Sequence, residues 1–479
     1  MTKHLDIDTK AMRAKILDLA IRGKLTDQRQ EDGNARDLLK EIQAEKEKLI
    51  KEKKIKKEKP LSEIAEEEKP FEIPENWEWV RLGEIIELQS GQDFPKSKYS
   101  DTDKEGIPYI TGASCFTKNG VLENRWTRFP KCIATKGDIL LVCKGSGYGK
   151  ITICNLQEVH IARQIMAIKR NKYLNLSYIE SFLMARIKLI KENGQGLIPG
   201  ISRDIVLNLL FPLPPLAEQQ RIADKVSAFF SHLDAIDKAY EEYRELQQIM
   251  KAKLLELAIQ GKLTDQRKEH GDARDLLKEI QAEKEKLIKE KKIKKEKSLP
   301  EIEADEIPFA IPKNWVWVRL NSIYNFIDYR GKTPKKLTEG IPLVTAKNVR
   351  MGYNDYSVKD FISAEEFKLR QSRGISHKGD LLFTTEAPLG NVSLADLDCF
   401  STGQRLIDFQ AYNSLAVSNK LFMYFIMSSF FQQALIDNQT GTTVAGIKAS
   451  RLKAILIPLP PLAEQKRIVA KLDELLPLL

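Results

Sequence analysis

An internal repeat constrains the fold of this 479-residue chain more than any other feature of its sequence. The segment RDLLKEIQAEKEKLIKEKKIKKEK occupies residues 36–59 and recurs without a single change at residues 274–297. Upstream of it, ILDLAIRGKLTDQR at 16–29 matches LLELAIQGKLTDQR at 254–267. Both pairs keep one constant offset, so no insertion separates them. The chain therefore repeats one scaffold.

Between the repeated segments, the two halves of the chain share only a skeleton of residues. After the matched segments IPENWEWVRL and IPKNWVWVRL, the surviving pairs are EGIPYITG with EGIPLVTA and KGDILL with KGDLLF. WEWVRL and VWVRL alternate as strands do, with tryptophans expected in the core, while YIESFLMARIKLIKEN and NKLFMYFIMSSFFQQALIDN are the clearest helical stretches. This pattern predicts two heads of one mixed fold, at residues 70–211 and 308–457, with different surfaces.

The connector PLPPLAEQ occurs at residues 212–219 and again at 458–465. Its prolines fix φ and lack a backbone donor, so we expect the preceding strand ladder to stop at them. A helix should follow, with Pro215 at its first position and Glu218 in its first turn, where the helix N-terminus favours both. Because the connector is repeated, it predicts a stiff joint from each head into a helical shaft.

The shaft after the first joint has the apolar spacing of a coiled coil. Its apolar residues at a and d positions are Ile222, Val226, Phe229, Leu233, Ile236, Tyr240 and Tyr243. Apolar residues continue to Ile259, so we expect one helix over 216–259. Gly23 and Gly261 should close helices in the left-handed region. Asn34 and Asp272 should start lysine-rich helices ending in KEKKIKKEK, for which a solvated face is favoured over phosphate contacts.

The second shaft is cut by the chain ends. Its start follows the second PLPPLAEQ, and its remainder corresponds to the first residues of the chain. The repeat therefore predicts that helices 10–21 and 462–479 both pack along the central helix 216–259, with the chain ends near each other.

Composition narrows the class of protein. The longest apolar stretches fall short of the roughly 18 residues of a membrane span, and MTKHLDIDTK is no signal peptide. Five cysteines without CxxC spacing and five scattered histidines predict reduced thiols in a cytoplasmic protein without a metal site. The net charge of +10 favours a polyanionic partner.

Motifs that carry catalysis are missing from the sequence. GSGYGKI at 145–151 has the wrong glycine spacing for a P-loop, and its last residue replaces Ser or Thr. No GxGxxG follows a strand, and no Asn-Pro-Pro-aromatic tetrapeptide of an amino-methyltransferase occurs. Each of these absences weakens the hypothesis that the chain is an enzyme, and an unrecognised site stays open.

The polar and basic side chains on the Gly-rich loops of the heads are the residue types that contact DNA phosphates and base edges. The candidates in the first head are Thr111, Ser114, Lys144, Ser146, Lys150, Arg163, Gln164 and Arg203. The candidates in the second head are Arg330, Lys332, Thr333, Lys347, Asn348, Gln404, Arg405 and Lys448.

The repeated PLPPLAEQ joints, the IPxNWxWVRL strands and the GIP and KGD skeletons closely resemble the specificity subunit of Type I restriction-modification systems. The resemblance spans essentially the whole chain and implies an α+β fold. Two target recognition domains, each reading half of a split DNA sequence, would be joined by long antiparallel coiled-coil helices with a pseudo-two-fold repeat. The segments would be 1–59 (helical spacer), 70–211 (first domain), 212–297 (central helices), 308–457 (second domain) and 458–479 (C-terminal helix).

The same resemblance implies the partners. Two modification subunits, which bind S-adenosylmethionine and methylate adenine, and restriction subunits, which use ATP and Mg²⁺, would assemble with this chain on double-stranded DNA and away from membranes. The chain itself would hold no cofactor. Two alternatives remain open: a coiled-coil adaptor without DNA recognition, and a stand-alone nuclease or methyltransferase.

Overall fold

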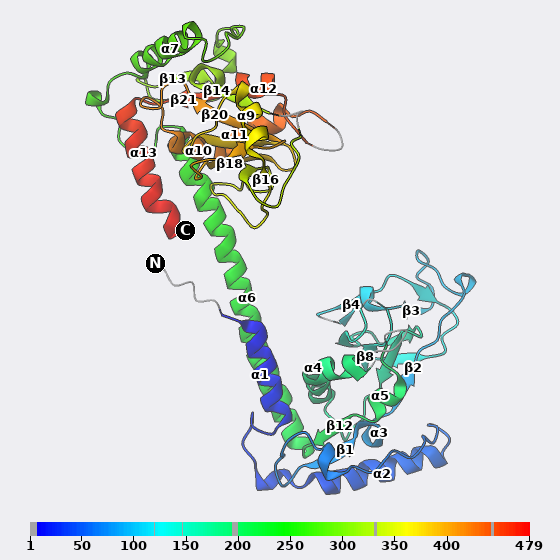
Figure 1. Cartoon of the computed structure of the whole chain (residues 1–479). Coiled ribbons are helices and arrows are strands. Elements are labelled where there is room, and N and C mark those ends of the chain that lie inside the picture. Colours follow the sequence, from blue (N-terminus) through cyan, green and yellow to red (C-terminus); the bar gives the residue numbers. More distant parts are fainter. Residues whose placement is uncertain (1–6, 119, 146, 194–199, 330–332, 442–444) are drawn as a thin grey trace. The chain divides into compact units, whose positions relative to one another are not determined.

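The computed structural model describes residues 7–118, 120–145, 147–193, 200–329, 333–441 and 445–479. The chain divides into an amino-terminal unit, which ends at Tyr240, and a carboxy-terminal unit, which begins at Glu241. Each unit contains one head and helices of the shaft (Figure 1).

The helices and turns of the amino-terminal unit are α1 (Thr9–Ile21), η1 (Gln30–Asp32), α2 (Ala35–Lys51), η2 (Glu66–Glu68), α3 (Leu82–Ile85), η3 (Lys96–Lys98), η4 (Ala113–Cys115), α4 (Leu176–Asn193), α5 (Arg203–Leu207) and the first part of α6 (Leu216–Ile259). Its strands are β1 (Glu78–Arg81), β2 (Leu88–Ser90), β3 (Ile107–Ile110), β4 (Phe116–Thr117), β5 (Gly120–Val121), β6 (Trp126–Thr127), β7 (Ile133–Thr135), β8 (Ile139–Val142), β9 (Ile151–Ile153), β10 (Glu158–Ile161), β11 (Ile165–Ile168) and β12 (Leu210–Leu213).

The helices and turns of the carboxy-terminal unit, after the end of α6, are η5 (Lys268–His270), α7 (Ala273–Lys289), η6 (Ala304–Glu306), α8 (Leu320–Ile323), α9 (Ala364–Arg370), η7 (Gln371–Arg373), α10 (Asn419–Met427), α11 (Ser429–Asp437), α12 (Ala449–Ala454), α13 (Leu462–Leu475) and η8 (Leu476–Leu478). Its strands are β13 (Val316–Arg319), β14 (Tyr324–Asp328), β15 (Ile341–Val344), β16 (Phe361–Ile362), β17 (Leu381–Thr385), β18 (Leu389–Leu394), β19 (Ser401–Thr402), β20 (Leu406–Ala411) and β21 (Leu456–Leu459).

The two heads share the topology of their larger sheet, whereas the smaller sheet has four strands in the first head (β6-β3-β10-β7) and three in the second (β16-β15-β19). The larger sheet has the order β2-β11-β8-β9 in the first head and β14-β20-β17-β18 in the second, with antiparallel neighbours in both. A smaller sheet in each head contains one parallel pair, β3 with β10 and β15 with β19. The prediction of two heads with one fold is confirmed, although most of their side chains differ.

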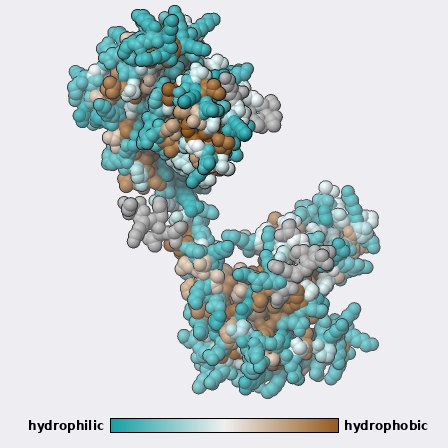
Figure 2. Space-filling view, viewed as in Figure 1, coloured by the Kyte–Doolittle hydropathy of each residue, from teal (hydrophilic) through white to brown (hydrophobic). Residues whose placement is uncertain are grey.

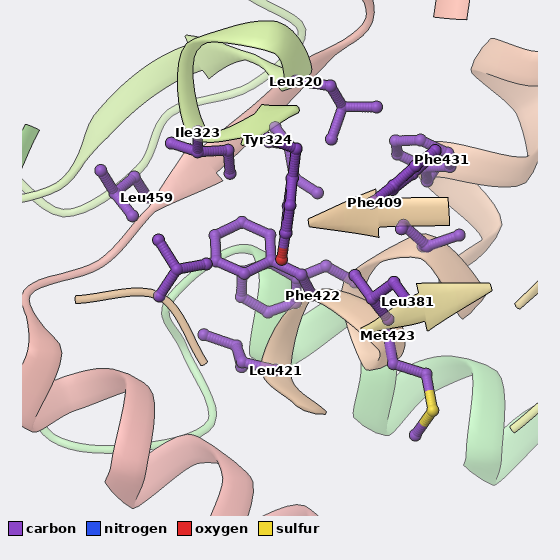
Figure 3. Packing of buried hydrophobic residues seen from close by; sticks show 14 of the residues in the cluster. Leu320, Ile323, Tyr324, Leu381, Phe409, Leu421, Phe422, Met423, Phe431 and Leu459 are labelled. Carbon is purple, nitrogen blue, oxygen red and sulfur yellow. The ribbon is translucent and has the colours of Figure 1, made fainter. Parts of the chain in front are cut away.

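Aromatic and aliphatic side chains fill the core of the second head between the larger sheet and the helices (Figure 3). Tyr324 on β14 meets the edge of Phe422 on α10, with ring centroids 5.7 Å apart. Phe409 on the central strand β20 stacks with Phe383 on β17 at 5.4 Å. The predicted helical stretch over 419–438 is in fact two helices, because Ser428 ends α10 and caps α11 through its hydroxyl.

The joint differs from the sequence prediction in two details. The ladder does not stop at the prolines: β12 continues through Pro212, which pairs with Trp79 of β1 in a two-stranded sheet. An edge strand tolerates proline, because the N–H that proline lacks is not needed there. The helix α6 begins at Leu216, so Pro215 lies just before the helix rather than at its first position.

A buried glutamate closes the joint. Glu218, in the first turn of α6, accepts hydrogen bonds from Trp77 Nε1 at 2.8 Å, Gln28 Nε2 at 2.7 Å and Thr26 Oγ1 at 3.1 Å. Burial raises the pKa of the Glu218 carboxyl, and the three donors oppose this shift. In the second copy Glu464 is equally buried and is bonded to the same GKLTDQ segment and to the ring of His270.

The neighbouring glutamine ties the joint to the head. Gln219 is fully buried, donates from Nε2 to Pro214 O at 2.9 Å and accepts the backbone N–H of Asn175 at 2.9 Å. Its counterpart Gln465 repeats both kinds of bond, at 3.0 Å to a proline carbonyl and 2.9 Å from a backbone N–H. The connector therefore fixes strand, helix and head as one rigid piece.

Antiparallel helices pack beside each joint. In the amino-terminal unit, α1 lies beside α6 (Figure 1), with Thr9 bonded to Asp237 at 2.7 Å and Arg13 paired with Asp234 at 2.5 Å. In the carboxy-terminal unit, Leu472 of α13 is buried in the same core as Leu255 near the end of α6. The contacts of α1 with α6 confirm the prediction for the first terminal helix, and α13 shares a hydrophobic core with the end of α6. The predicted approach of the chain ends involves residues 1–6, which lie outside the described residues.

The helix ends follow the predicted capping. Gly23 and Gly261 adopt φ of 67° and 69° directly after α1 and α6, and the side chains of Asn34 and Asp272 cap α2 and α7. Both lysine-rich helices end before most of the KEKKIKKEK tail. The surface over α2 and α7 is largely hydrophilic (Figure 2). Within the described ranges, no helix has the length and apolar character needed to cross a membrane.

Replacement of the joint glutamate tests its structural role. Glu218→Gln places an amide donor against one of three existing donors, so we expect the free energy of unfolding of the amino-terminal unit to fall by about 1–3 kcal/mol. Glu245→Gln, at an exposed position of the same helix, is the control. Urea denaturation followed by tryptophan fluorescence measures both, and equal stability of the two variants would contradict the assigned role.

Asp408 gives the second head a pH-dependent stability. Its carboxyl is fully buried on the central strand, at the position that Ala167 occupies in the first head. Burial raises the pKa of Asp408 well above its ordinary range, and the nearby charge of Asp380 adds to the shift. The unfolded carboxyl ionises near pH ~4 and the folded carboxyl at a higher pH, so stability falls as pH rises from ~4 until the folded carboxyl also ionises.

We therefore expect Asp408→Asn to gain stability relative to the wild-type chain as pH rises from 5 to 7, by up to about 1.4 kcal/mol per pH unit. The exposed Asp437→Asn is the control. Denaturation of each protein across this pH range is the measurement, and parallel pH profiles for wild type and Asp408→Asn would show that the carboxyl ionises in the folded protein.

Candidate nucleic-acid interface

Five loops meet at one end of the larger sheet in each head. In the first head they are the exit loop after β2 (91–95), the shoulder loop after β3 (111–115), the hairpin between β8 and β9 (143–150), the turn before β11 (162–164) and the approach loop before α5 (200–202). The second head has the equivalent loops after β14, after β15, between β17 and β18, before β20 and before α12.

Backbone hydrogen bonds join these loops in the first head. The N–H of Cys143 in the hairpin donates to Gln164 O in the turn at 2.7 Å, and Cys143 O accepts from Ile201 in the approach loop at 2.8 Å. The N–H of Ala162 donates to Ile110 O at 3.0 Å, which joins the turn to the shoulder loop. We call this meeting point the loop junction.

The second head builds the loop junction from the same bonds. The N–H of Thr385 donates to Arg405 O at 2.9 Å, and Thr385 O accepts from Ile447 at 3.0 Å. The N–H of Gly403 donates to Val344 O at 2.6 Å. The two heads therefore share the backbone hydrogen bonds of the junction, while the side chains that it presents and the φ angle of the last turn residue differ.

Glycine allows the loops of the first head to approach this closely. A Cβ on Gly147 of the hairpin would lie 2.2 Å from Ala113 Cβ in the shoulder loop. A Cβ on Gly91 of the exit loop would lie 2.1 Å from Ala162 O in the turn. Any side chain at either position would push the loops apart.

The turn of the first head presents Arg163 and then Gln164. The guanidinium of Arg163 pairs with Asp93 of the exit loop at 2.8 Å, and its backbone N–H also donates to that carboxylate at 3.1 Å. The side chain of Gln164 lies beside two glycines, where a Cβ on Gly112 would come within 3.2 Å of its Oε1, and one on Gly145 within 3.6 Å.

The turn of the second head has the same two residue types in reverse order. Gln404 comes first and donates to Thr333 of the exit loop. Arg405 follows, and its Nε lies 3.1 Å from the Glu386 carboxylate in the hairpin. Each head thus holds one arginine at the junction by a carboxylate, but at a different place in the turn.

Most of the predicted contact residues lie on the surface of these loops. The exposed ones are Ser114, Lys144, Lys150, Arg163, Gln164, Thr333, Lys347, Gln404, Arg405 and Lys448. Thr111 is half-buried in the shoulder loop. Ser146, Arg330 and Lys332 lie outside the described residues.

Two predicted residues are less exposed and serve the fold. Arg203 is half-buried and donates to Leu88 O and to Glu58, so it ties α5 to the lysine-rich tail. Asn348 is only 2% exposed; its Oδ1 accepts from Thr345 N–H at 2.9 Å and its Nδ2 donates to two backbone carbonyls. Its amide holds the shoulder loop in shape.

Sequence reasoning missed Asp93 and Glu386. A search for basic and amide side chains passes over carboxylates, which are repelled by DNA. A strand-by-strand alignment of the two heads makes Glu386 the equivalent of Lys144. Each of these residues directly follows the hairpin residue whose N–H donates to the turn. Their role follows only from the arginines that they hold.

The geometry agrees with the comparisons to known proteins. A family model described as the Type I restriction modification DNA specificity domain matches residues 74–246 and 312–477. The chain is 32% identical to the Type I restriction enzyme EcoAI specificity subunit of Escherichia coli, with 98% of this chain and 89% of that protein covered. It is 28% identical to the EcoEI specificity subunit of the same organism, with 97% and 88% covered.

One solved structure also resembles the chain. It belongs to work on complex assembly and conformational transition of the type I R-M system, with a TM-score of 0.55, 22% identity, and coverage of 85% of this chain and 91% of that one. At this identity the likeness shows the fold alone.

The exposed lysines of the junction loops test duplex binding. If Lys150 and Lys448 contact phosphates, Lys150→Gln and Lys448→Gln should each lower affinity for every duplex sequence and reduce the salt slope by about one. Lys40→Gln, on the exposed face of α2, is the matched control. Fluorescence anisotropy across a salt series measures the slope, and unchanged slopes for both junction variants would remove these lysines from the interface.

Proposed function

The chain belongs to the Type I restriction modification DNA specificity family, and from this premise we propose that it reads the two halves of a split, asymmetric DNA target. The observation that carries the proposal is the loop junction: both heads join their loops by the same backbone hydrogen bonds but present different side chains. One shared arrangement of the loops suits one mode of docking on the duplex. Different side chains suit two different half-sites.

The repeated scaffold supports partners present in two copies. The sequences of α2 and α7 are identical, and the joints around Glu218 and Glu464 repeat each other. Two equal surfaces suit two copies of one subunit arranged about a pseudo-two-fold axis. We propose that these copies are modification subunits, and that restriction subunits join the same complex on DNA in the cytoplasm.

The chemistry belongs to these partners in our proposal. Modification subunits would bind S-adenosylmethionine and methylate adenine, and restriction subunits would use ATP and Mg²⁺. The present chain would supply position and sequence choice without a cofactor or catalytic residue of its own. The missing catalytic motifs in its sequence support this division of roles.

Methylation mapping tests the proposal. The chain, expressed with modification subunits, should direct methylation of adenines within one bipartite sequence. Replacing residues 328–445 with the equivalent segment of a relative should change one half-site and leave the other and the spacer intact.

Two outcomes would contradict this function. A change in both half-sites would rule out independent heads. Absence of any salt-dependent duplex binding by the complex would instead favour the coiled-coil adaptor.

A further inference from the structure

We propose that the last two residues of the turn before β11 and of the turn before β20 read bases, with Arg163 and Arg405 each recognising a guanine and Gln164 and Gln404 each recognising an adenine. The inference rests on the proposed function and adds which side chains read which base. Asp93 and Glu386 are positioning residues that hold the arginines.

The turn is the central element of the loop junction. The carbonyl of its last residue, Gln164 or Arg405, accepts a hydrogen bond from the hairpin. The N–H of its first residue, Ala162 or Gly403, donates to the end of the strand that precedes the shoulder loop. The exit loop reaches it through Asp93 in one head and Thr333 in the other. The turn is therefore held against three of the other four loops, which places its side chains as directional recognition requires.

The ion pairs argue for base contacts rather than phosphate contacts. Arg163 and Arg405 are exposed and each already faces a carboxylate, at 2.8 and 3.1 Å. Pairing cancels much of the positive charge that would attract a phosphate, but it fixes the plane and direction of the guanidinium. Exposed ion pairs add little to fold stability, so stability does not account for them.

Backbone strain marks the same place in the second head. Among non-glycine residues in the described part of the chain, four have positive φ: Lys53, Lys291, Ala387 and Arg405. The two lysines directly follow the caps of α2 and α7, where left-handed residues close helices. Ala387 and Arg405, at φ of 46° and 65°, both lie at the loop junction. Strain retained at an exposed arginine, where glycine would relieve it, points to a function of that side chain.

Base chemistry then assigns the ligand. Guanine presents O6 and N7 in the major groove, which the fork of an arginine contacts with two hydrogen bonds. Adenine presents N7 and N6, which match the amide of glutamine. Because the order is Arg-Gln in the first head and Gln-Arg in the second, the two heads select these bases at different positions of the turn.

The test uses the complex with modification subunits, bound to a library of duplexes that varies both half-sites. Arg405→Gln should reduce the preference for guanine at one position of the second half-site by about 10-fold or more and leave the first half-site unchanged. Arg163→Gln should do the same in the first half-site. Glu386→Gln should weaken guanine preference, and Glu386→Asp should restore most of it.

Two further variants distinguish a loss of base preference from a loss of fold stability and from a loss of phosphate contacts. Arg405→Gly relieves the positive φ, so it should match or exceed the wild-type Tm while losing the guanine preference; a drop in Tm would indicate a structural role. Lys448→Gln should weaken binding to all sequences and reduce the salt slope by about one. Arg405→Gln should change the slope less, because its charge is already paired.

The inference is wrong if Arg405→Gln weakens binding to all duplex sequences equally and reduces the salt slope of binding by about one, because a lost phosphate contact has this effect. It is also wrong if the variant leaves every base preference intact. A wild-type complex that selects no bipartite sequence would instead overturn the proposed function itself.

Discussion

The buried carboxylate at each joint is the interaction on which the rest of the structure depends. Glu218 and Glu464 each lie in the first turn of a helix that directly follows a strand of the head. Each carboxylate accepts hydrogen bonds from a segment distant in sequence. The helix N-terminus and these donors together offset the cost of burying a charge. Because each glutamate holds its helix to the GKLTDQ segment beside the head, the loops of the heads can vary without destabilising the joint.

The loop junction likewise combines constant contacts with variable side chains. Its contacts are backbone hydrogen bonds, which do not depend on the identity of the side chains, so both heads keep them. The side chains that point outward are then free to differ, as Gln164 and Arg405 do at equivalent positions. A recognition surface of this kind can change its ligand without a change of fold.

The repeat made the scaffold predictable from sequence, because identical segments must form identical structures. The helix over 216–259, the glycines that follow α1 and α6, and the caps at Asn34 and Asp272 follow from local chemistry alone. The path of β12 through Pro212 did not, since sequence does not show that a strand has only one partner. The break at Ser428 was hidden because both helices around it are apolar.

The candidate site was predictable only in outline. Composition located the polar loops, but it could not separate Asn348, whose amide is used internally, from exposed neighbours such as Lys347. Nor could it connect Arg405 with Glu386, because that pairing depends on the register of β17 with β20. Sequence patterns report which side chains are polar, whereas the sheet register decides which of them meet. The pairing of Arg405 with Glu386 is therefore a property of the fold, and its relation to the pairing of Arg163 with Asp93 becomes visible only when the two heads are aligned strand by strand.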